Sequence, residues 1–222
     1  MKILVKFPTR GRKNKFLSVL KRYYDLCEDK NNIHFLITID EDDVEMNEQH
    51  TIDVLKTYEN LTFIIGVSES KIHAINRDMD KINDEWSIIL LASDDMIPQI
   101  KGYDNIIRNK MNENFSDTDG VLWFNDGFQG NRLNTLCILG KKYYERFNYI
   151  YQPDYKSCFC DNEFMDVANI LKKQIYFNDV IIKHEHPDWG YGKNDLIHQK
   201  NVNNFTHDSN LYNLRKSNNF YL

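Results

Sequence analysis

Residues Trp86–Pro98 read WSIILLASDDMIP, and this stretch decides the fold. Ser87–Ala92 is a nearly unbroken apolar run, rich in Ile and Leu and too short to cross a membrane, which predicts a strand buried on both faces. Two adjacent carboxylates, Asp94 and Asp95, follow the run. A buried strand that ends in paired acids presents them at the carboxyl edge of an α/β sheet, where such folds bind ligands.

The paired acids have a chemistry of their own. Two carboxylates held this close repel each other unless a cation or a hydrogen-bond donor lies between them. Their hard oxygen atoms suit Mg²⁺ or Mn²⁺ carrying a phosphate, so the stretch predicts a site for a divalent metal and a diphosphate. A solvated Ser-Asp-Asp turn before Pro98 is the alternative, and for an isolated Asp-Asp pair it is the simpler one.

Composition bounds the class of protein. The chain has 222 residues, 41% hydrophobic and 27% charged, which fits a globular protein with one substantial core. No apolar run approaches the roughly 18 residues of a membrane helix, and no cleavable apolar segment precedes the first strand, so we expect a cytoplasmic protein without a membrane span. A net charge of −5 gives no overall basic field for nucleic acid. The four cysteines lack zinc-site spacing and are expected to be free thiols.

The first two expected strands end in polar groups. The strand Lys2–Phe7 leads into Pro8-Thr9-Arg10-Gly11-Arg12, and the apolar spacing of 16–26 predicts a helix after this turn. Arg10 and Arg12 suit a phosphate or a base carbonyl, although surface arginines often only solubilise a turn. The second strand, Ile33–Ile39, ends at Asp40, whose carboxylate suits a ribose hydroxyl or a base N–H.

A third strand, Leu61–Val67, precedes a basic helix start. Ser70 is expected to cap a short helix. Lys71, Asn76 and Arg77 are then expected to point toward the same sheet edge, where a helix start bearing Lys and Arg favours an anion.

The second half adds acids and histidines. We expect a helix over 100–115, strands at Gly120–Asn125 and Leu136–Leu139, a helix at Lys141–Phe147, a helix opening within Tyr155–Phe164 and a last strand at Gln174–Ile182. Asp161 and Glu163 lie near the start of the helix that opens within Tyr155–Phe164. Acids at a helix start interact favourably with the helix dipole, and one of these two can also act as a general base. His184 and His186 share a face of an extended segment. One of them is expected to complete a metal shell, and zinc bound by the two histidines is the competing interpretation.

These motifs, in this order, resemble a GT-A glycosyltransferase close to the family-2 type. The nucleotide-sugar half is carried by Phe7-Pro8-Thr9-Arg10-Gly11-Arg12, Asp40, Ala74-Ile75-Asn76-Arg77 and Ser93-Asp94-Asp95, and the acceptor half by Cys160-Asp161-Asn162-Glu163-Phe164 and His184-Glu185-His186-Pro187. The resemblance implies a three-layer α/β/α sandwich with a mostly parallel central sheet. It also implies one domain over 1–222, with a nucleotide-sugar half at 1–98, an acceptor half at 99–200 and a tail at 201–222.

The resemblance also implies roles for single residues. The turn with Pro8, Thr9, Arg10 and Arg12 borders the nucleotide, Asp40 meets the base, and Lys71, Asn76 and Arg77 face the ribose and diphosphate. Asp95 binds the metal with Asp94 beside it, and Ser93 replaces the first acid of the Asp-x-Asp motif, which weakens the ribose contact expected there. Asp161 or Glu163 matches the catalytic base, and His184 or His186 the later metal ligand.

The implied function is a metal-dependent transferase. With Mn²⁺ or Mg²⁺, it moves a sugar from a nucleoside-diphosphate sugar, UDP first among the candidates, to an acceptor hydroxyl with inversion. The acceptor stays open among a glycan, a lipid-linked sugar, a protein and a modified nucleobase. A nucleotidyltransferase is an alternative, although Pro8–Arg12 holds a single glycine where that class has a Gly-rich loop. A non-catalytic nucleotide- or sugar-binding module is the other.

Overall fold

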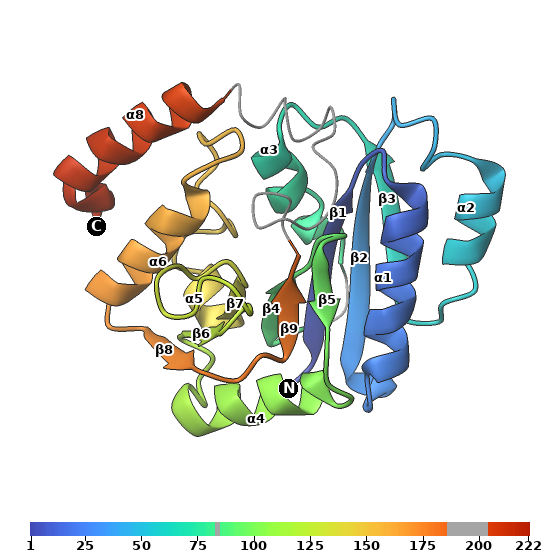
Figure 1. Ribbon diagram of the computed structural model, residues 1–222, viewed down its shortest axis with the longest axis horizontal. Helices are drawn as coiled ribbons and strands as arrows, with labels where there is room; N and C mark the ends of the chain where they lie inside the picture. Colours follow the sequence, from blue (N-terminus) through green and yellow to red (C-terminus); the bar gives the residue numbers. More distant parts are fainter. Residues whose placement is uncertain (83–84, 186–203) are drawn as a thin grey trace.

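The computed structural model describes residues 1–82, 85–185 and 204–222. Its main sheet has seven strands in the order β3-β2-β1-β4-β7-β6-β8, and a two-stranded sheet pairs β5 with β9 (Figure 1). The strands are β1 (Ile3–Thr9), β2 (Ile33–Asp40), β3 (Leu61–Gly66), β4 (Ile88–Leu91), β5 (Met96–Pro98), β6 (Val121–Phe124), β7 (Ile138–Gly140), β8 (Gln174–Phe177) and β9 (Ile182–His184). The α-helices are α1 (Lys13–Leu26), α2 (Gln49–Leu55), α3 (Lys71–Asn76), α4 (Tyr103–Asn114), α5 (Lys141–Tyr144), α6 (Cys160–Ile170) and α8 (Phe205–Ser217).

The sheet is mostly parallel, as predicted. β1 pairs in parallel with β2 and β4, and β2 pairs in parallel with β3, so these four strands end at one edge. β7 runs antiparallel between β4 and β6. The α/β class and the parallel central sheet of the GT-A expectation are therefore confirmed.

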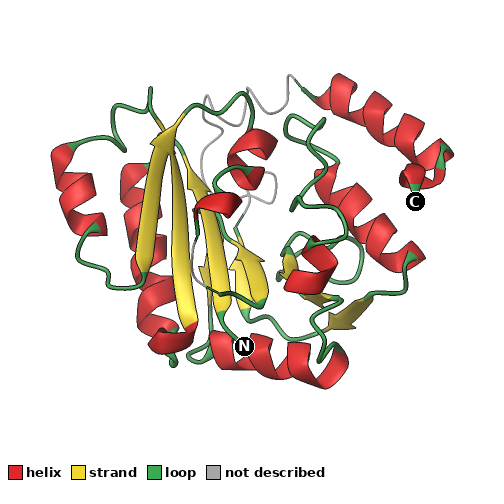
Figure 2. Cartoon of the chain, turned by 180° about the vertical axis from the view of Figure 1, so that it is seen from behind, coloured by secondary structure: helices red, strands yellow, loops and turns green. Residues whose placement is uncertain are grey.

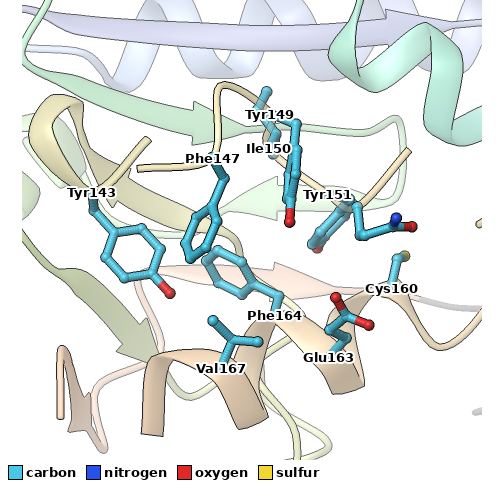
Figure 3. Close-up of a pocket in the computed structure, with 10 residues that line it drawn as sticks. Tyr143, Phe147, Tyr149, Ile150, Tyr151, Cys160, Glu163, Phe164 and Val167 are labelled. Atoms are coloured by element: carbon cyan, nitrogen blue, oxygen red, sulfur yellow. The ribbon is translucent and has the colours of Figure 1, made fainter. Parts of the chain in front are cut away.

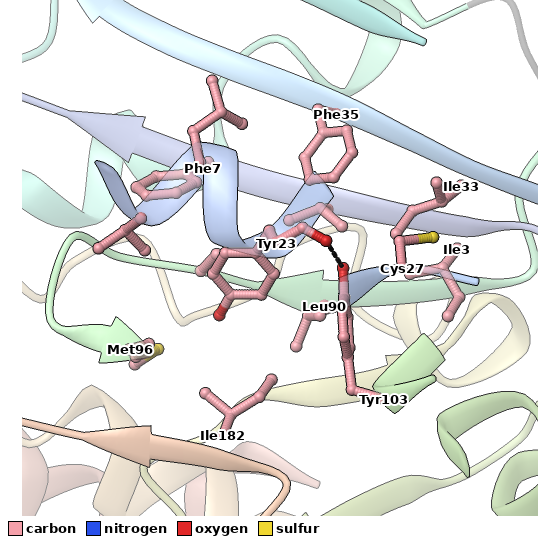
Figure 4. Close-up of a cluster of buried hydrophobic side chains, with 14 of the residues drawn as sticks. Ile3, Phe7, Tyr23, Cys27, Ile33, Phe35, Leu90, Met96, Tyr103 and Ile182 are labelled. Carbon is pink, nitrogen blue, oxygen red and sulfur yellow. Dashed lines mark hydrogen bonds between the residues drawn. The ribbon is translucent and has the colours of Figure 1, made fainter. Parts of the chain in front are cut away.

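The side chains of β4 contribute to a hydrophobic core on each face of the sheet, because successive side chains of a strand point to opposite faces. Ile88 and Leu90 pack with residues of α1 and α4, whereas Ile89 and Leu91 pack with residues of α3, α5 and α6. Figure 4 shows the first core, where the Tyr103 hydroxyl donates to the carbonyl of Tyr23 at 3.1 Å. Helices therefore cover both faces, which gives the three layers (Figure 2).

The expected last strand, Gln174–Ile182, is wrong in its extent. The structure divides it into β8, which pairs with β6, and β9, which pairs with β5. The polar residues Asn178 and Asp179 lie in the break between the two strands. Because β9 joins a different sheet, His184 lies opposite Met96, directly after the paired acids.

Candidate active site

Asp95 and His184 lie side by side beyond the carboxyl end of β4. Oδ1 of Asp95 is 3.6 Å from Nε2 of His184. Backbone contacts hold the two segments together: the amide of Glu185 donates to the carbonyl of Asp95 at 2.7 Å, and the amide of His184 donates to the carbonyl of Asp126 at 2.9 Å. The short β5–β9 ladder thus brings together two of the three predicted metal ligands, and His186 lies outside the described residues.

The Asp95 carboxylate is buried and stays charged. Burial alone would raise the pKa of Asp95, but the imidazole of His184 and the hydroxyl of Ser93 outweigh that effect, so the pKa lies well below its usual range. The Ser93 hydroxyl donates to Oδ1 of Asp95. Ser93 therefore holds Asp95, two residues later, in addition to any contact it makes with a ligand.

Asp94 faces the opposite way, toward the turn after β1. Its Oδ1 lies 3.1 Å from a guanidinium nitrogen of Arg12 and 3.6 Å from the ammonium of Lys15. Burial raises the pKa of Asp94, and the positive charge of Arg12 opposes the rise. The two acids thus have separate tasks in the structure, since one meets a histidine and the other holds two cations at the start of α1.

The donor set tests whether a divalent cation fits. Asp95 supplies carboxylate oxygens and His184 an imidazole nitrogen, and both ligand types suit Mn²⁺. Across residues 1–82, 85–185 and 204–222, no group of three or more His, Cys, Asp or Glu side chains surrounds a common point. Asp95 and His184 therefore fit a metal whose remaining ligands come from phosphate oxygens and water, as is usual for Mg²⁺-type sites.

Asp40, at the end of β2, is enclosed by arginines. Arg10 reaches Oδ2 of Asp40 at 2.7 Å and also binds Asp42 through two hydrogen bonds of 2.6 and 2.7 Å. Oδ1 of Asp40 is buried and has no hydrogen-bond partner among the described residues. A buried acceptor without a donor is costly, so this oxygen is suited to the N–H or hydroxyl of a ligand.

Arg77 closes the other side of Asp40. Its guanidinium donates to the Ile39 carbonyl at 2.7 Å and lies 3.7 Å from Asp40. A Cβ on Gly66 would lie 2.6 Å from a guanidinium nitrogen of Arg77, so a larger residue at the end of β3 would displace this guanidinium. Arg77 therefore supports the end of β2, at Ile39 and Asp40, from within the protein.

Asp161 and Glu163, the two candidate bases, have different surroundings. Burial raises the pKa of the half-buried Asp161, and the charge of Lys71 opposes the rise. Glu163 is buried in an ion pair: Arg215 donates to both of its oxygens at 2.8–3.0 Å, and the Tyr155 hydroxyl donates to Oε2 at 2.8 Å. Both oxygens of Glu163 are engaged, so Asp161 is the better placed of the two for proton transfer.

Figure 3 shows Glu163 at the wall of a cavity between α5, the segment that follows it, and α6. The cavity has a volume of about 20 Å³, which accommodates one water molecule. It is therefore too small for a sugar ring. Its lining is largely aromatic and consists of Tyr143, Phe147, Tyr149, Ile150, Tyr151, Gln152, Cys160, Glu163, Phe164 and Val167.

Comparison with known proteins supports the architecture. The mannosyltransferase PcManGT from Pyrobaculum calidifontis, solved in complex with GDP-Man and Mn²⁺, matches with a TM-score of 0.64 at 13% identity over 86% of this chain and 58% of that one. S. aureus TarS 1-349, solved in complex with UDP-GlcNAc, matches with a TM-score of 0.64 at 14% identity over 82% of this chain and 57% of that one. The chain has the GT-A fold. No family model and no curated protein matches it.

The chain spans less than three fifths of these two structures. In the described part of the chain, no helix combines the length and apolarity that a membrane crossing requires.

Asn76, predicted to face the ribose and diphosphate, binds the backbone of a remote loop. Its side-chain nitrogen donates to the carbonyl of Tyr151 at 2.7 Å, and its oxygen accepts from the amides of Ile150 and Tyr151 at 2.9 and 3.1 Å. Both polar atoms are thus engaged and Asn76 anchors the backbone at 150–151, while its contact with a donor stays a prediction. Ser70 caps α3 as predicted, accepting from the amide of His73 at 3.1 Å.

The remaining predicted residues of the GT-A site lie at the same sheet edge. Pro8 and Thr9 end β1, with Pro8 opposite Thr38 and the Thr9 hydroxyl 3.9 Å from the Met46 sulfur. Lys71 is exposed at the start of α3. Its positive charge opposes the effect of burial on the pKa of Asp161 and adds to the larger effects of His184 and Ser93 on the pKa of Asp95. Lys71 therefore acts electrostatically on both the expected metal ligand and the expected base.

Several residues that shape the site were not predicted. Lys15 could have been predicted from the sequence, because it stands one helical turn after Arg12 at the start of a helix. Asp126 could not have been predicted. Its side chain accepts from the amides of Phe128 and Gln129 and from the Thr135 hydroxyl, and its carbonyl accepts from the amide of His184. These partners follow from the folded loop and not from a motif.

Proposed function

We propose that the chain is a glycosyltransferase that moves a sugar from a nucleoside-diphosphate sugar to an acceptor hydroxyl. One observation carries the proposal: Asp95 and His184 meet at 3.6 Å at the sheet edge that also bears the cations of Arg12 and Lys15. This combination suits a divalent cation and a diphosphate. PcManGT with GDP-Man and Mn²⁺, and TarS with UDP-GlcNAc, are consistent with that chemistry on this fold.

The donor is bound along the edge from β2 to β4. Oδ1 of Asp40, which accepts no hydrogen bond from the described residues and lies 3.7 Å from the Arg77 guanidinium, takes an N–H of the base or a ribose hydroxyl, and Arg10 limits the space beside it. Arg12, Lys15 and Lys71 face the diphosphate, where their charges stabilise the phosphate charge that grows as the sugar leaves. UDP is the first nucleotide to test.

Asp95 and His184 hold the cation, Mn²⁺ or Mg²⁺, with His186 as a further candidate ligand. When bound, a divalent ion supplies charge neutralisation of the leaving nucleoside diphosphate. Asp94 acts beside it by holding Arg12 and Lys15 in place.

Asp161 accepts the proton of the acceptor hydroxyl. A sugar hydroxyl is a poor nucleophile at neutral pH, so a positioned carboxylate raises the rate of attack. Burial raises the pKa of Asp161, which makes it a stronger base than an exposed aspartate. Attack from the side opposite the leaving diphosphate inverts the anomeric centre.

Donor binding is tested by thermal shift with UDP, GDP and their sugar conjugates, with and without Mn²⁺. We expect stabilisation by one nucleotide class, strengthened by Mn²⁺ and reduced in Asp95→Asn, because a ligand that binds only the folded state raises its stability. Asp53→Asn, at an exposed residue of α2 that contacts Gln49, is the matched control and should respond like the wild type. No nucleotide response in the wild type would refute the proposal.

Turnover separates the alternatives. With the donor found above, Asp161→Asn should lower the turnover rate at least 100-fold and leave donor affinity within about twofold, as expected for loss of a general base. Glu163→Gln should instead lower the melting temperature through loss of the Arg215 pair while keeping turnover. Release of pyrophosphate would point to a nucleotidyltransferase, and metal-dependent binding without turnover to a binding module.

A further inference from the structure

The C-terminal helix α8 binds the backbone of the segment just before α6 through hydrogen bonds. Asp208 is fully buried and accepts three hydrogen bonds from consecutive backbone amides: Lys156 at 3.0 Å, Ser157 at 2.8 Å and Cys158 at 2.8 Å. His207 lies 2.9 Å from the same carboxylate. Burial would raise the pKa of Asp208, but these amides and His207 outweigh it and lower the pKa, so a charged carboxylate is held inside the protein.

The residue after these amides has a strained backbone. Phe159 is the N-cap of α6 and has φ of 59°, a left-handed conformation that costs a non-glycine residue about 1–2 kcal/mol. Its ring stacks on Tyr212 with centroids 5.6 Å apart and meets Phe205 edge-on at 5.1 Å. Both partners belong to α8, so the helix that binds the amides also holds the ring of the strained residue.

α8 also contacts α6 beyond this point. Arg215 binds both oxygens of Glu163, and the Tyr212 hydroxyl and Lys216 bind Asp166 at 2.6 and 2.9 Å. Contacts of α8 therefore lie on both sides of Asp161, from Lys156 to Asp166, although no bond between α8 and Asp161 itself is present in the described structure. Figure 1 shows α8 lying along α6.

We infer that α8 is a clamp that sets the direction of the Asp161 side chain, and that Asp208 is its central positioning residue. The inference rests on the proposed function, in which Asp161 is the general base. Asp161 is in the first turn of α6, two residues after Phe159, and its Oδ1 accepts from the amide of Asn162 at 3.0 Å. A change in the left-handed backbone conformation at Phe159 changes the direction of the first turn of α6 and with it the position of the Asp161 carboxylate. A displacement of about 1 Å at a reacting group can lower a rate about 100-fold.

The test compares Asp208→Asn with Asp166→Asn. Both make the same chemical change at an acid between α6 and α8, but Asp166 lies beyond Asp161 and binds no amide of the 156–158 segment. Phe205→Ala is the second variant, because Phe205 is 53% exposed and its loss leaves no buried charge unpaired. Hydrogen exchange of the amides at 156–162 is measured first, followed by kcat and donor KM.

We expect exchange at 156–162 to become at least tenfold faster in Asp208→Asn, and kcat to fall about 10- to 100-fold with donor KM changed less than threefold. Phe205→Ala should shift both quantities in the same direction by a smaller factor, and Asp166→Asn should leave both near wild type. Faster exchange with unchanged kcat overturns the positioning role, and unchanged exchange overturns the clamp. A wild-type chain that turns over no donor overturns the proposed function, while the exchange result still decides whether α8 holds this segment.

Discussion

Lys6 makes the stability of this protein depend on pH in a calculable way. Its side chain is fully buried in β1, where its ammonium donates to the Thr38 hydroxyl and to the Arg77 carbonyl at 2.7 Å. Burial lowers the pKa of Lys6 from 10.5 to about 7, against the opposing charge of Asp78. The folded protein therefore releases this proton at a lower pH than the unfolded chain does.

The sign and size follow from this difference. Between pH 7 and 10.5 the unfolded chain binds the proton and the folded protein does not, so the free energy of unfolding rises with pH. At 1.36 kcal/mol for each pKa unit, the rise between pH 7 and pH 9.5 is about 3 kcal/mol. Below pH 7 both states are protonated and the contribution levels off.

Urea unfolding followed by tryptophan fluorescence measures the effect. We compare the wild type with Lys6→Met from pH 6 to pH 9.5, because methionine has a similar length and no proton to lose. The difference in unfolding free energy, wild type minus variant, should rise by about 3 kcal/mol. Lys56→Met makes the same change at an exposed lysine and corrects for general effects of charge. A difference that stays within about 1 kcal/mol over this range would refute the reasoning.

Three further outcomes are expected. Hydrogen bonds from Arg146, together with Lys173, lower the pKa of Asp119 to about 2. The contribution of Asp119 to the free energy of unfolding is therefore present above the usual aspartate pKa and lost as pH falls through 2. Asp119→Asn should lower the free energy of unfolding by about 2 kcal/mol at pH 7 in urea unfolding, and the difference from wild type should close on acidification. Among the four free thiols, Cys158 alone is not buried, so mass spectrometry after brief native alkylation should find it modified first; earlier modification of Cys137 would contradict the packing. A Cβ on Gly140 would collide with the backbone carbonyl of Thr118, so Gly140→Ala should lower the unfolding free energy by more than about 2 kcal/mol, whereas an unchanged midpoint would show that β7 can shift.

The sheet edge could be predicted because its signals are local. The apolar run of β4 marks a strand buried on both faces, and parallel strands carry their ends to one edge, so Asp40 and the acids at 94 and 95 had to converge. The sequence predicted that either His184 or His186 joins Asp95, because two histidines at a strand end in a chain with paired acids indicate a metal shell, and the resemblance implied the same. The β5–β9 ladder that brings His184 to Asp95 has no sequence signal beyond two short apolar runs.

Side-chain partners far along the chain were beyond sequence reasoning. Asn76 was predicted as a ligand contact, but in the structure both of its polar side-chain atoms bind the backbone at 150–151, which is 74 to 75 positions away. Glu163 and Asp161 are equivalent in a linear reading of the helix start, and they are distinguished by Arg215, 52 residues after Glu163, and by the Tyr155 hydroxyl, which both bind Glu163. Each of these contacts depends on tertiary packing that periodicity does not encode.

The site owes its geometry to backbone contacts more than to its own side chains. His184 is held by the hydrogen bond that its backbone amide donates to the Asp126 carbonyl and by its place opposite Met96 in the ladder. Asp95 is held through its carbonyl, which accepts from the amide of Glu185. These contacts form during folding, so the cost of bringing a carboxylate and an imidazole together does not fall on ligand binding. Asp161 follows the same rule, since the amides before it are fixed by Asp208 and the turn by the rings of α8. The proposed chemistry thus depends on three short segments, each held by hydrogen bonds of its backbone to a part of the chain remote in sequence.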